Sequence, residues 1–167
     1  MFTRILVPTD FSEPSDAALQ YARMVAAKFG ASINLLHVFE PPLYLAGVVS
    51  SEVYVADTSA IQAELMEQAK NNLAERVTAG DRERYGATTE IVTGQTASSI
   101  VKFATEQHMD LIVMGTHGRS GMSHLLLGSV AEHVVRTAPC PVLTVRREPM
   151  PSEVPEALIR EWVQAGG

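Results

Sequence analysis

Five short apolar runs alternate with segments of helical periodicity, and this alternation restricts the possible folds more than any other feature of the chain. The runs are continuously apolar, which is typical of strands that helices cover on both faces. We expect strands at residues 5–7, 33–38, 88–92, 111–114 and 142–145. Strands and helices in this order predict an α/β fold, with an open doubly wound sheet of five parallel strands and helices on both faces.

The helices expected between these strands are defined by the spacing of their apolar residues. The first ends at Gly30, the second covers residues 59–84, the third covers residues 94–108, and the fourth begins at Gly128. The side chains expected to face the core are Ile61, Leu65, Ala69, Leu73 and Val77 of the second helix, and Val130, Val134, Val135 and Ala138 of the fourth. Residues 43–58 show no period, and we expect a long loop there.

The length and composition favour one domain followed by a tail. A chain of 167 residues corresponds to about one domain, which we place at residues 1–147, with a tail at 148–167 that has room for a short helix. No apolar run reaches the ~20 residues of a membrane span. The N-terminus lacks the long apolar core of a signal peptide, and Cys140 is the single cysteine, so we expect a cytoplasmic protein. A net charge of −6 without a basic stripe argues against nucleic-acid binding.

Two groups of residues at the expected strand ends carry the chemistry of a ligand site. In an open doubly wound sheet, ligands bind beyond the carboxyl ends of the strands, where the strand order reverses. Asp10 follows the first strand, and a glycine- and serine-bearing loop at residues 115–127 follows the fourth. Asp10 either caps the first helix or binds a ribose hydroxyl or a metal on a nucleotide, and both interpretations stay open here.

The loop after the fourth strand has the parts of a phosphate-binding site. Gly115 and Gly118 allow the backbone to approach a ligand closely. Gly128 and Ser129 stand at the start of a helix, where N–H groups and the helix dipole favour anions. Arg119 adds a guanidinium fork suited to phosphate oxygens. The alternative interpretation is a glycine-rich turn that only leads into a helix.

Three known phosphate-binding or phosphate-transfer arrangements are missing from the sequence. No G-x-G-x-x-G follows the first strand, which disfavours a dinucleotide site. No G-x-x-x-x-G-K-[ST] occurs and no lysine lies near the loop, which disfavours a lysine clamp on the phosphates. A response-regulator site would need an aspartate after the third strand and a lysine after the fifth, where this chain has Thr93 and Arg146.

The spacing of the loop resembles the ATP-binding branch of the universal stress protein family, which carries the motif G-x2-G-x9-G-[ST]. Here Gly115, Gly118, Gly128 and Ser129 match all four positions, with nine residues between the second glycine and the third. The apolar strands on either side are also similar to those of the family, so that the resemblance covers residues 1–147.

The resemblance implies that ATP, with Mg²⁺, lies across the strand ends of a Rossmann-like or flavodoxin-like sheet with strand order 3-2-1-4-5. The residues that it assigns are Pro8, Thr9 and Asp10 beside the adenosine, Val38, Met114 and Gly115 around the base and ribose, and Gly118, Arg119, Gly128, Ser129 and Val130 around the phosphates. It also implies a homodimer that pairs the last strands, Val142–Val145, antiparallel. Such pairing would cover an apolar sheet edge.

Three functions agree with such a site. The first, which we favour, is a nucleotide-dependent regulator or sensor in the stress response, whose state an unidentified protein partner reads. The second is a slow ATPase or autophosphorylating protein. No catalytic residue is assigned to it, because the loop offers no obvious general base and lacks a clamp lysine. The third is a module that binds AMP or cyclic AMP.

Overall fold

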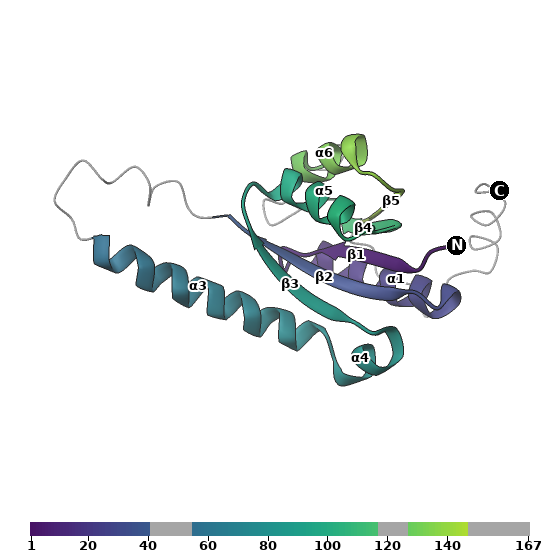
Figure 1. Cartoon of the computed structure of the whole chain (residues 1–167), viewed down its shortest axis with the longest axis horizontal. Coiled ribbons are helices and arrows are strands. Elements are labelled where there is room, and N and C mark those ends of the chain that lie inside the picture. The colour runs from purple at the N-terminus through teal and green to yellow at the C-terminus, as the bar shows by residue number, and fades with distance from the viewer. Residues whose placement is uncertain (41–54, 117–126, 147–167) are drawn as a thin grey trace.

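The computed structural model describes residues 1–40, 55–116 and 127–146 (Figure 1). The strands are β1 (Arg4–Pro8), β2 (Ser32–Phe39), β3 (Thr88–Thr93), β4 (Leu111–Gly115) and β5 (Val142–Val145). The helices are α1 (Glu13–Phe29), α3 (Val55–Arg76), α4 (Ala79–Tyr85), α5 (Thr96–Glu106) and α6 (Ser129–Thr137). None of the helices in these described ranges is long and apolar enough to cross a membrane.

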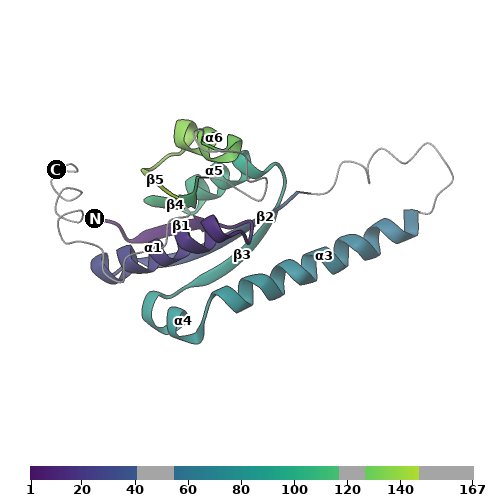
Figure 2. The same ribbon diagram turned by 180° about the vertical axis from the view of Figure 1, so that it is seen from behind.

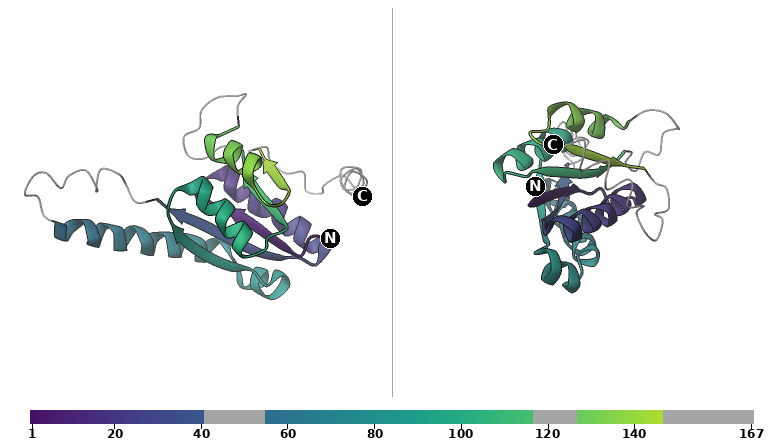
Figure 3. Two further views of the ribbon diagram at one scale, coloured as in Figure 1. Left: turned by 45° about the horizontal axis from the view of Figure 1, so that its top comes forward. Right: turned by 90° about the vertical axis from the view of Figure 1, so that its right-hand side faces the viewer.

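The five strands form one parallel sheet in the order β3-β2-β1-β4-β5, which confirms the predicted fold (Figure 3). β1 lies at the centre, where Ile5 is the register partner of both Ile33 in β2 and Leu111 in β4. From β1 the chain moves outward to β2 and β3, and then returns to the other side of β1 for β4 and β5. The strand order therefore reverses between β1 and β4, and a ligand is expected at this position.

Side chains of the central strand alternate between two layers of helices. Ile5 and Val7 pack with α1 and with the C-terminal half of α3, whereas Leu6 between them packs with α5 and α6. Figure 2 shows α1 lying across the first of these faces. All three side chains are fully buried. Burial on both faces explains why the strands are continuously apolar in the sequence.

The segment predicted as one helix at residues 59–84 contains two helices, α3 and α4. The first of them ends at Arg76, and the second begins after Thr78, whose hydroxyl accepts a hydrogen bond from the backbone N–H of Asp81. The Asp81 carboxylate accepts in return from the backbone N–H of Thr78. This reciprocal capping begins a new helix without interrupting the apolar spacing, so the spacing did not reveal it. Residues 43–54 of the loop predicted at residues 43–58 lie outside the described residues. Residues 55–58 belong to α3, so the prediction is wrong for this last part.

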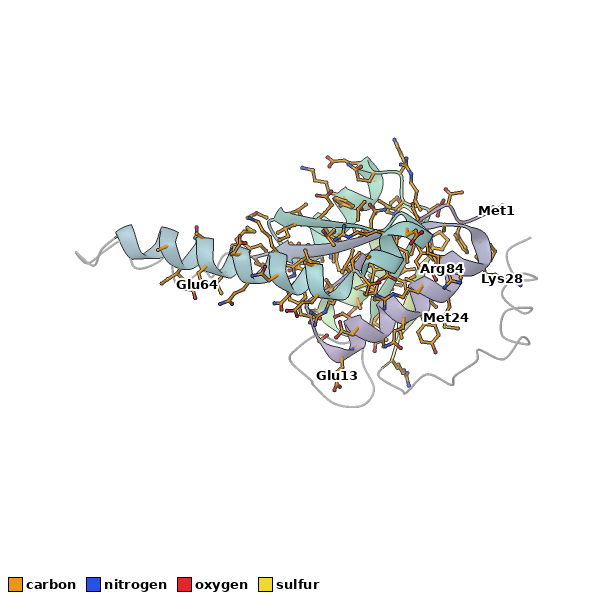
Figure 4. The ribbon with its side chains drawn as sticks, turned by 90° about the horizontal axis from the view of Figure 1, so that it is seen from below. Met1, Glu13, Met24, Lys28, Glu64 and Arg84 are labelled. Carbon is orange, nitrogen blue, oxygen red and sulfur yellow. The ribbon has the colours of Figure 1, made fainter. Side chains whose placement is uncertain are left out.

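The N-terminal half of α3 extends beyond the edge of the sheet, where Glu64 marks it in Figure 4. Of the side chains predicted to face the core, Ala69 and Leu73 in α3 and Val77 directly after it are buried, and Leu65 is partly buried. Ile61 was predicted to face the core and is 45% exposed, because it belongs to the N-terminal half of α3, which has no sheet beneath it. Val135 of α6 is also an incorrect prediction, at 47% exposed. It lies one position beyond the buried Val134, and ~100° of helix rotation carries it away from the sheet.

An ion pair joins α1 to α4 in the first helical layer. Arg23 donates through Nε and Nη2 to the two carboxylate oxygens of Asp81, at 2.8 and 2.7 Å. The side chains of Arg23 and Asp81 are 29% and 10% exposed, so water screens the pair only in part. The hydrogen bond from Arg23 is the main cause that lowers the pKa of Asp81 from 3.8 to about 2.

We expect the stabilisation that Asp81 provides to disappear as the pH falls. A carboxyl group with a lower pKa in the folded protein stabilises the fold above its unfolded pKa of 3.8, and this contribution is lost toward the folded value of about 2. The full contribution is on the order of 2 kcal/mol. Urea unfolding should therefore show a difference in the free energy of unfolding between wild type and Asp81→Asn at neutral pH that shrinks toward about pH 2. A difference independent of pH would contradict this assignment.

Candidate functional site

A cleft of about 210 Å³ opens at the carboxyl edge of the sheet, between the ends of β1 and β4. Its lining residues come from the ends of three strands, β1, β2 and β4, and from the starts of three helices, α1, α5 and α6. They are Pro8, Thr9, Asp10, Ser15, Leu36, His37, Val38, Thr96, Ile100, Met114, Gly115, Thr116, Gly128, Ser129, Val130 and Ala131. The cleft therefore lies at the reversal of strand order, where doubly wound sheets bind their ligands.

Most of the residues that the sequence assigned to a ligand site lie together in this cleft. Those that line it are Pro8, Thr9, Asp10, Val38, Met114, Gly115, Gly128, Ser129 and Val130. The two others, Gly118 and Arg119, lie outside the described residues. The structure thus brings the described members of the set together, and their role in binding a nucleotide stays a prediction.

Sequence reasoning missed seven lining residues. They are Ser15, Leu36, His37, Thr96, Ile100, Thr116 and Ala131. A signal existed for some of them, because the first turn of a helix that follows a strand lies at the same sheet edge as the strand end. By that argument, Thr96 and Ile100 at the start of α5 could have been predicted from their position after β3.

The cleft has an apolar part and a polar part. The apolar side chains that line it are Pro8, Leu36, Val38, Ile100, Met114, Val130 and Ala131. The polar part contains hydroxyl groups, the imidazole of His37 and the carboxylate of Asp10. Within the described part of the chain, the lining has no lysine or arginine, and no group of three or more potential metal-binding side chains occurs. The apolar part suits a flat ring, and the polar part suits a group with hydroxyls and negative charge.

The start of α6 supplies the positive end of a helix dipole to the cleft. Its N-cap is Gly128, which has no side chain to satisfy the first N–H groups. The backbone N–H of Gly128 itself donates to the carbonyl oxygen of Thr116 at 2.8 Å, which fixes the helix start against the end of β4. The N–H groups of Ser129, Val130 and Ala131 have no partner within the helix. These groups and the dipole favour an anion beside them.

A hydrogen-bond network fixes the turn from β1 into α1. The Ser15 hydroxyl donates to the carbonyl oxygen of Ser12 at 2.8 Å, so its oxygen accepts from the Thr9 hydroxyl at 3.0 Å. The Thr9 hydroxyl accepts in turn from the backbone N–H of Phe11 at 3.0 Å. The Thr9 backbone N–H donates to the carbonyl oxygen of Leu36 in β2 at 2.8 Å. Thr9 therefore shapes the cleft through this network.

Asp10 lines the cleft and is hydrogen-bonded to the residue that precedes α1, and its binding of a ligand stays a prediction. Its carboxylate accepts hydrogen bonds from the backbone N–H and the hydroxyl of Ser12, the N-cap residue of α1. The same side chain lines the cleft, at the end of the central strand. Ser12 does not cap α1 through its own side chain. The carboxylate is thus held at the rim of the cleft by the residue that starts the helix, and an acceptor held in this way suits a ligand hydroxyl.

Comparison with known proteins gives a consistent family assignment. The model of the universal stress protein family matches residues 1–146. Universal stress protein MJ0531 of Methanocaldococcus jannaschii is 34% identical over 149 residues, which cover 88% of this chain and 84% of the relative. The structure of hypothetical protein MJ0577 from the same organism has a TM-score of 0.73 at 32% identity, over 90% of this chain and 99% of the other. A universal stress protein solved in complex with cAMP has a TM-score of 0.54 at 27% identity, over 88% of this chain and 98% of the other.

Proposed function

Because the chain belongs to the universal stress protein family, we propose that its cleft binds an adenine nucleotide, and that this nucleotide is ATP with Mg²⁺. The observation that carries the proposal is the start of α6, which lines the same cleft as Asp10 and an apolar wall. Donors for phosphates, an acceptor for ribose hydroxyls and a surface for a base are the requirements of nucleotide binding. The relative solved with cAMP supports the same class of ligand.

The chemistry of the cleft suggests how each part of the nucleotide would bind. The base would lie against Val38 and Met114, and the ribose hydroxyls would donate to Asp10. The phosphates would accept from the N–H groups at the start of α6, with Gly118 and Arg119 completing their site. Since Asp10 is the one carboxylate among the described lining residues, Mg²⁺ would be held mainly by phosphate oxygens and water.

We assign this binding to regulation in the stress response. Occupancy of the cleft would set a state that a protein partner reads in the cytoplasm. A homodimer would form through β5, which pairs only with β4 and is one of the two edges of the described sheet (Figure 3). Antiparallel pairing of two copies along Val142–Val145 would cover the exposed backbone of that edge.

The proposal is tested by isothermal titration calorimetry, in which nucleotide-free protein is titrated with ATP, AMP and cyclic AMP in the presence of Mg²⁺. We expect ATP to bind most tightly, because α6 offers N–H groups to more than one phosphate. Tighter binding of AMP or cyclic AMP would favour a module for those ligands. The relative solved in complex with cAMP supports this alternative. If none of the three binds at about 1 mM, any binding free energy is weaker than ~4 kcal/mol, and the proposed function is wrong.

A slow ATPase is distinguished from a regulator by the products. Incubation with ATP and Mg²⁺ should leave the nucleotide intact on the time scale of its binding and release if regulation is the function. Steady release of phosphate that Arg119→Ala abolishes would favour the ATPase instead, because an arginine fork stabilises the charge that develops on a transferred phosphoryl group.

A further inference from the structure

Phe11 has a backbone conformation that is unusual for its residue type. Its φ angle is +66°, in the left-handed region, and among the described non-glycine residues only His108 shares a positive φ. A bulky side chain in this region is a genuine outlier, since its Cβ crowds the following carbonyl group. Such a conformation persists only where the surrounding structure holds it in place. The residue directly follows Asp10, at the turn from β1 into α1.

The aromatic ring of Phe11 is held between two side chains from other elements. The ring of His37 in β2 stacks on it, with centroids 4.4 Å apart and an interplanar angle of 28°. The guanidinium carbon of Arg76, in the last turn of α3, lies 5.0 Å from the ring centroid. Arg76 Nη2 also donates to the carbonyl oxygen of Phe11 at 3.2 Å. A cation over an aromatic face and an aromatic stack are both attractive, so the ring has a defined place.

Both neighbours of the ring are themselves fixed. Arg76 Nε donates to the carboxylate of Asp16 in α1 at 2.7 Å, and its Nη1 donates to the carbonyl oxygen of Asn72 at 3.1 Å. His37 Nδ1 lies 2.9 Å from the carbonyl oxygen of Thr9. The conformation of Phe11 is thus imposed jointly by β2, α1 and α3.

Phe11 does not line the cleft, but Thr9, Asp10 and His37 do. We propose that Phe11 is the positioning residue of the nucleotide site: clamped between His37 and Arg76, it holds the left-handed turn that sets Asp10 at the rim of the cleft. This inference rests on the proposed function. Without the clamp, the backbone after Asp10 would sample other conformations, and the carboxylate would be ordered only when the ligand binds. The cost of that ordering would appear as weaker binding.

The test uses a variant that removes the ring and still permits the left-handed backbone. Phe11→Gly loses both ring contacts, whereas glycine adopts a positive φ without strain. We expect its affinity for ATP to fall about tenfold, with Phe11→Tyr, which keeps the ring, close to wild type. Thr3→Ala is the structural control, since it removes the hydrogen bond from the Thr3 hydroxyl to Asp110 just before β4, at the edge of the sheet opposite the cleft. That variant should lower stability and leave the affinity of the folded protein unchanged.

A double-variant cycle with Asp10→Asn shows whether Phe11 acts through Asp10. We expect each single variant to lose about tenfold in affinity for ATP. If Phe11 acts through Asp10, the double variant should also lose about tenfold, because the carboxylate that Phe11 positions is already gone, whereas independent effects would give about a hundredfold. Additive losses, or an unchanged affinity in Phe11→Gly, would overturn the positioning role while leaving the proposed function intact. Failure of the wild type to bind ATP, AMP or cyclic AMP would overturn both.

Discussion

Replacing Ser129 with aspartate should stabilise the protein and at the same time weaken its binding of ATP by about a hundredfold, or ~2.8 kcal/mol. Ser129 is exposed and occupies the first position of α6. A carboxylate there interacts favourably with the helix dipole, by ~0.3–1 kcal/mol. The same carboxylate lies where the phosphates would bind, and two like charges about 4 Å apart repel by up to ~4 kcal/mol near a protein surface. Opposite signs for stability and affinity are the signature of an anion site.

The measurement pairs urea unfolding with calorimetric titration of Ser129→Asp, and Ser129→Asn serves as the uncharged control of similar size. Adenosine is a second control, because it lacks the phosphates and should bind Ser129→Asp and wild type alike. Loss of adenosine binding would show that the variant disturbs the cleft in general. Unchanged ATP affinity in the stabilised aspartate variant would place the phosphates elsewhere.

Replacing Gly115 with alanine should destabilise the protein by about 1–3 kcal/mol, the usual cost of an overpacked core. A Cβ atom at Gly115 would lie 2.9 Å from the Cβ of Pro14 and 3.0 and 3.1 Å from its carbonyl carbon and oxygen. Pro14 belongs to the first turn of α1 and cannot move without moving that helix start. Because Gly115 and the turn before α1 both line the cleft, ATP binding should weaken together with stability.

Gly80→Ala is the matched control for this substitution. A Cβ atom at Gly80 would have its nearest neighbour at 3.7 Å, the hydroxyl oxygen of Thr78, which is an ordinary contact. Within α4, alanine is favoured over glycine, so stability should stay the same or rise slightly. Urea unfolding of both variants gives the comparison. Equal stability of Gly115→Ala and Gly80→Ala would contradict the close approach of β4 to Pro14.

The fold could be predicted from the sequence because its main determinant is local. Continuous apolar runs such as residues 111–114 mark strands buried on both faces, and their alternation with helical spacing leaves few topologies. The position of Asp10 and of Gly128 could be predicted for the same reason, since both directly adjoin a strand or helix end that topology places at one edge of the sheet. That edge is where the cleft lies.

What could not be predicted depends on contacts between residues that are distant in the sequence. The clamp on Phe11 needs Arg76, 65 residues away, and the spacing of apolar residues gives no sign of that pair. The break before α4 was missed because the side chain of Thr78 caps the start of a new helix within an unbroken apolar period. Ile61 was misassigned because spacing shows which side of a helix is apolar, but not where the sheet beneath it ends.

The cleft also explains how an acidic chain could hold a polyphosphate. The net charge is −6, yet the described part of the proposed anion site consists of backbone N–H groups at the start of α6, which are independent of side-chain charge. Repulsion from exposed carboxylates at a distance is screened within ~8 Å at physiological ionic strength. We therefore expect the local arrangement of donors to outweigh the overall charge.

The most direct test of the central claim is a crystal structure of the protein grown with ATP and Mg²⁺. The account predicts the adenine against Val38 and Met114, the ribose hydroxyls within hydrogen-bond distance of Asp10, and phosphate oxygens at the N–H groups of Ser129 and Val130. A nucleotide bound away from this cleft, or density for none in crystals saturated with ATP, would contradict it.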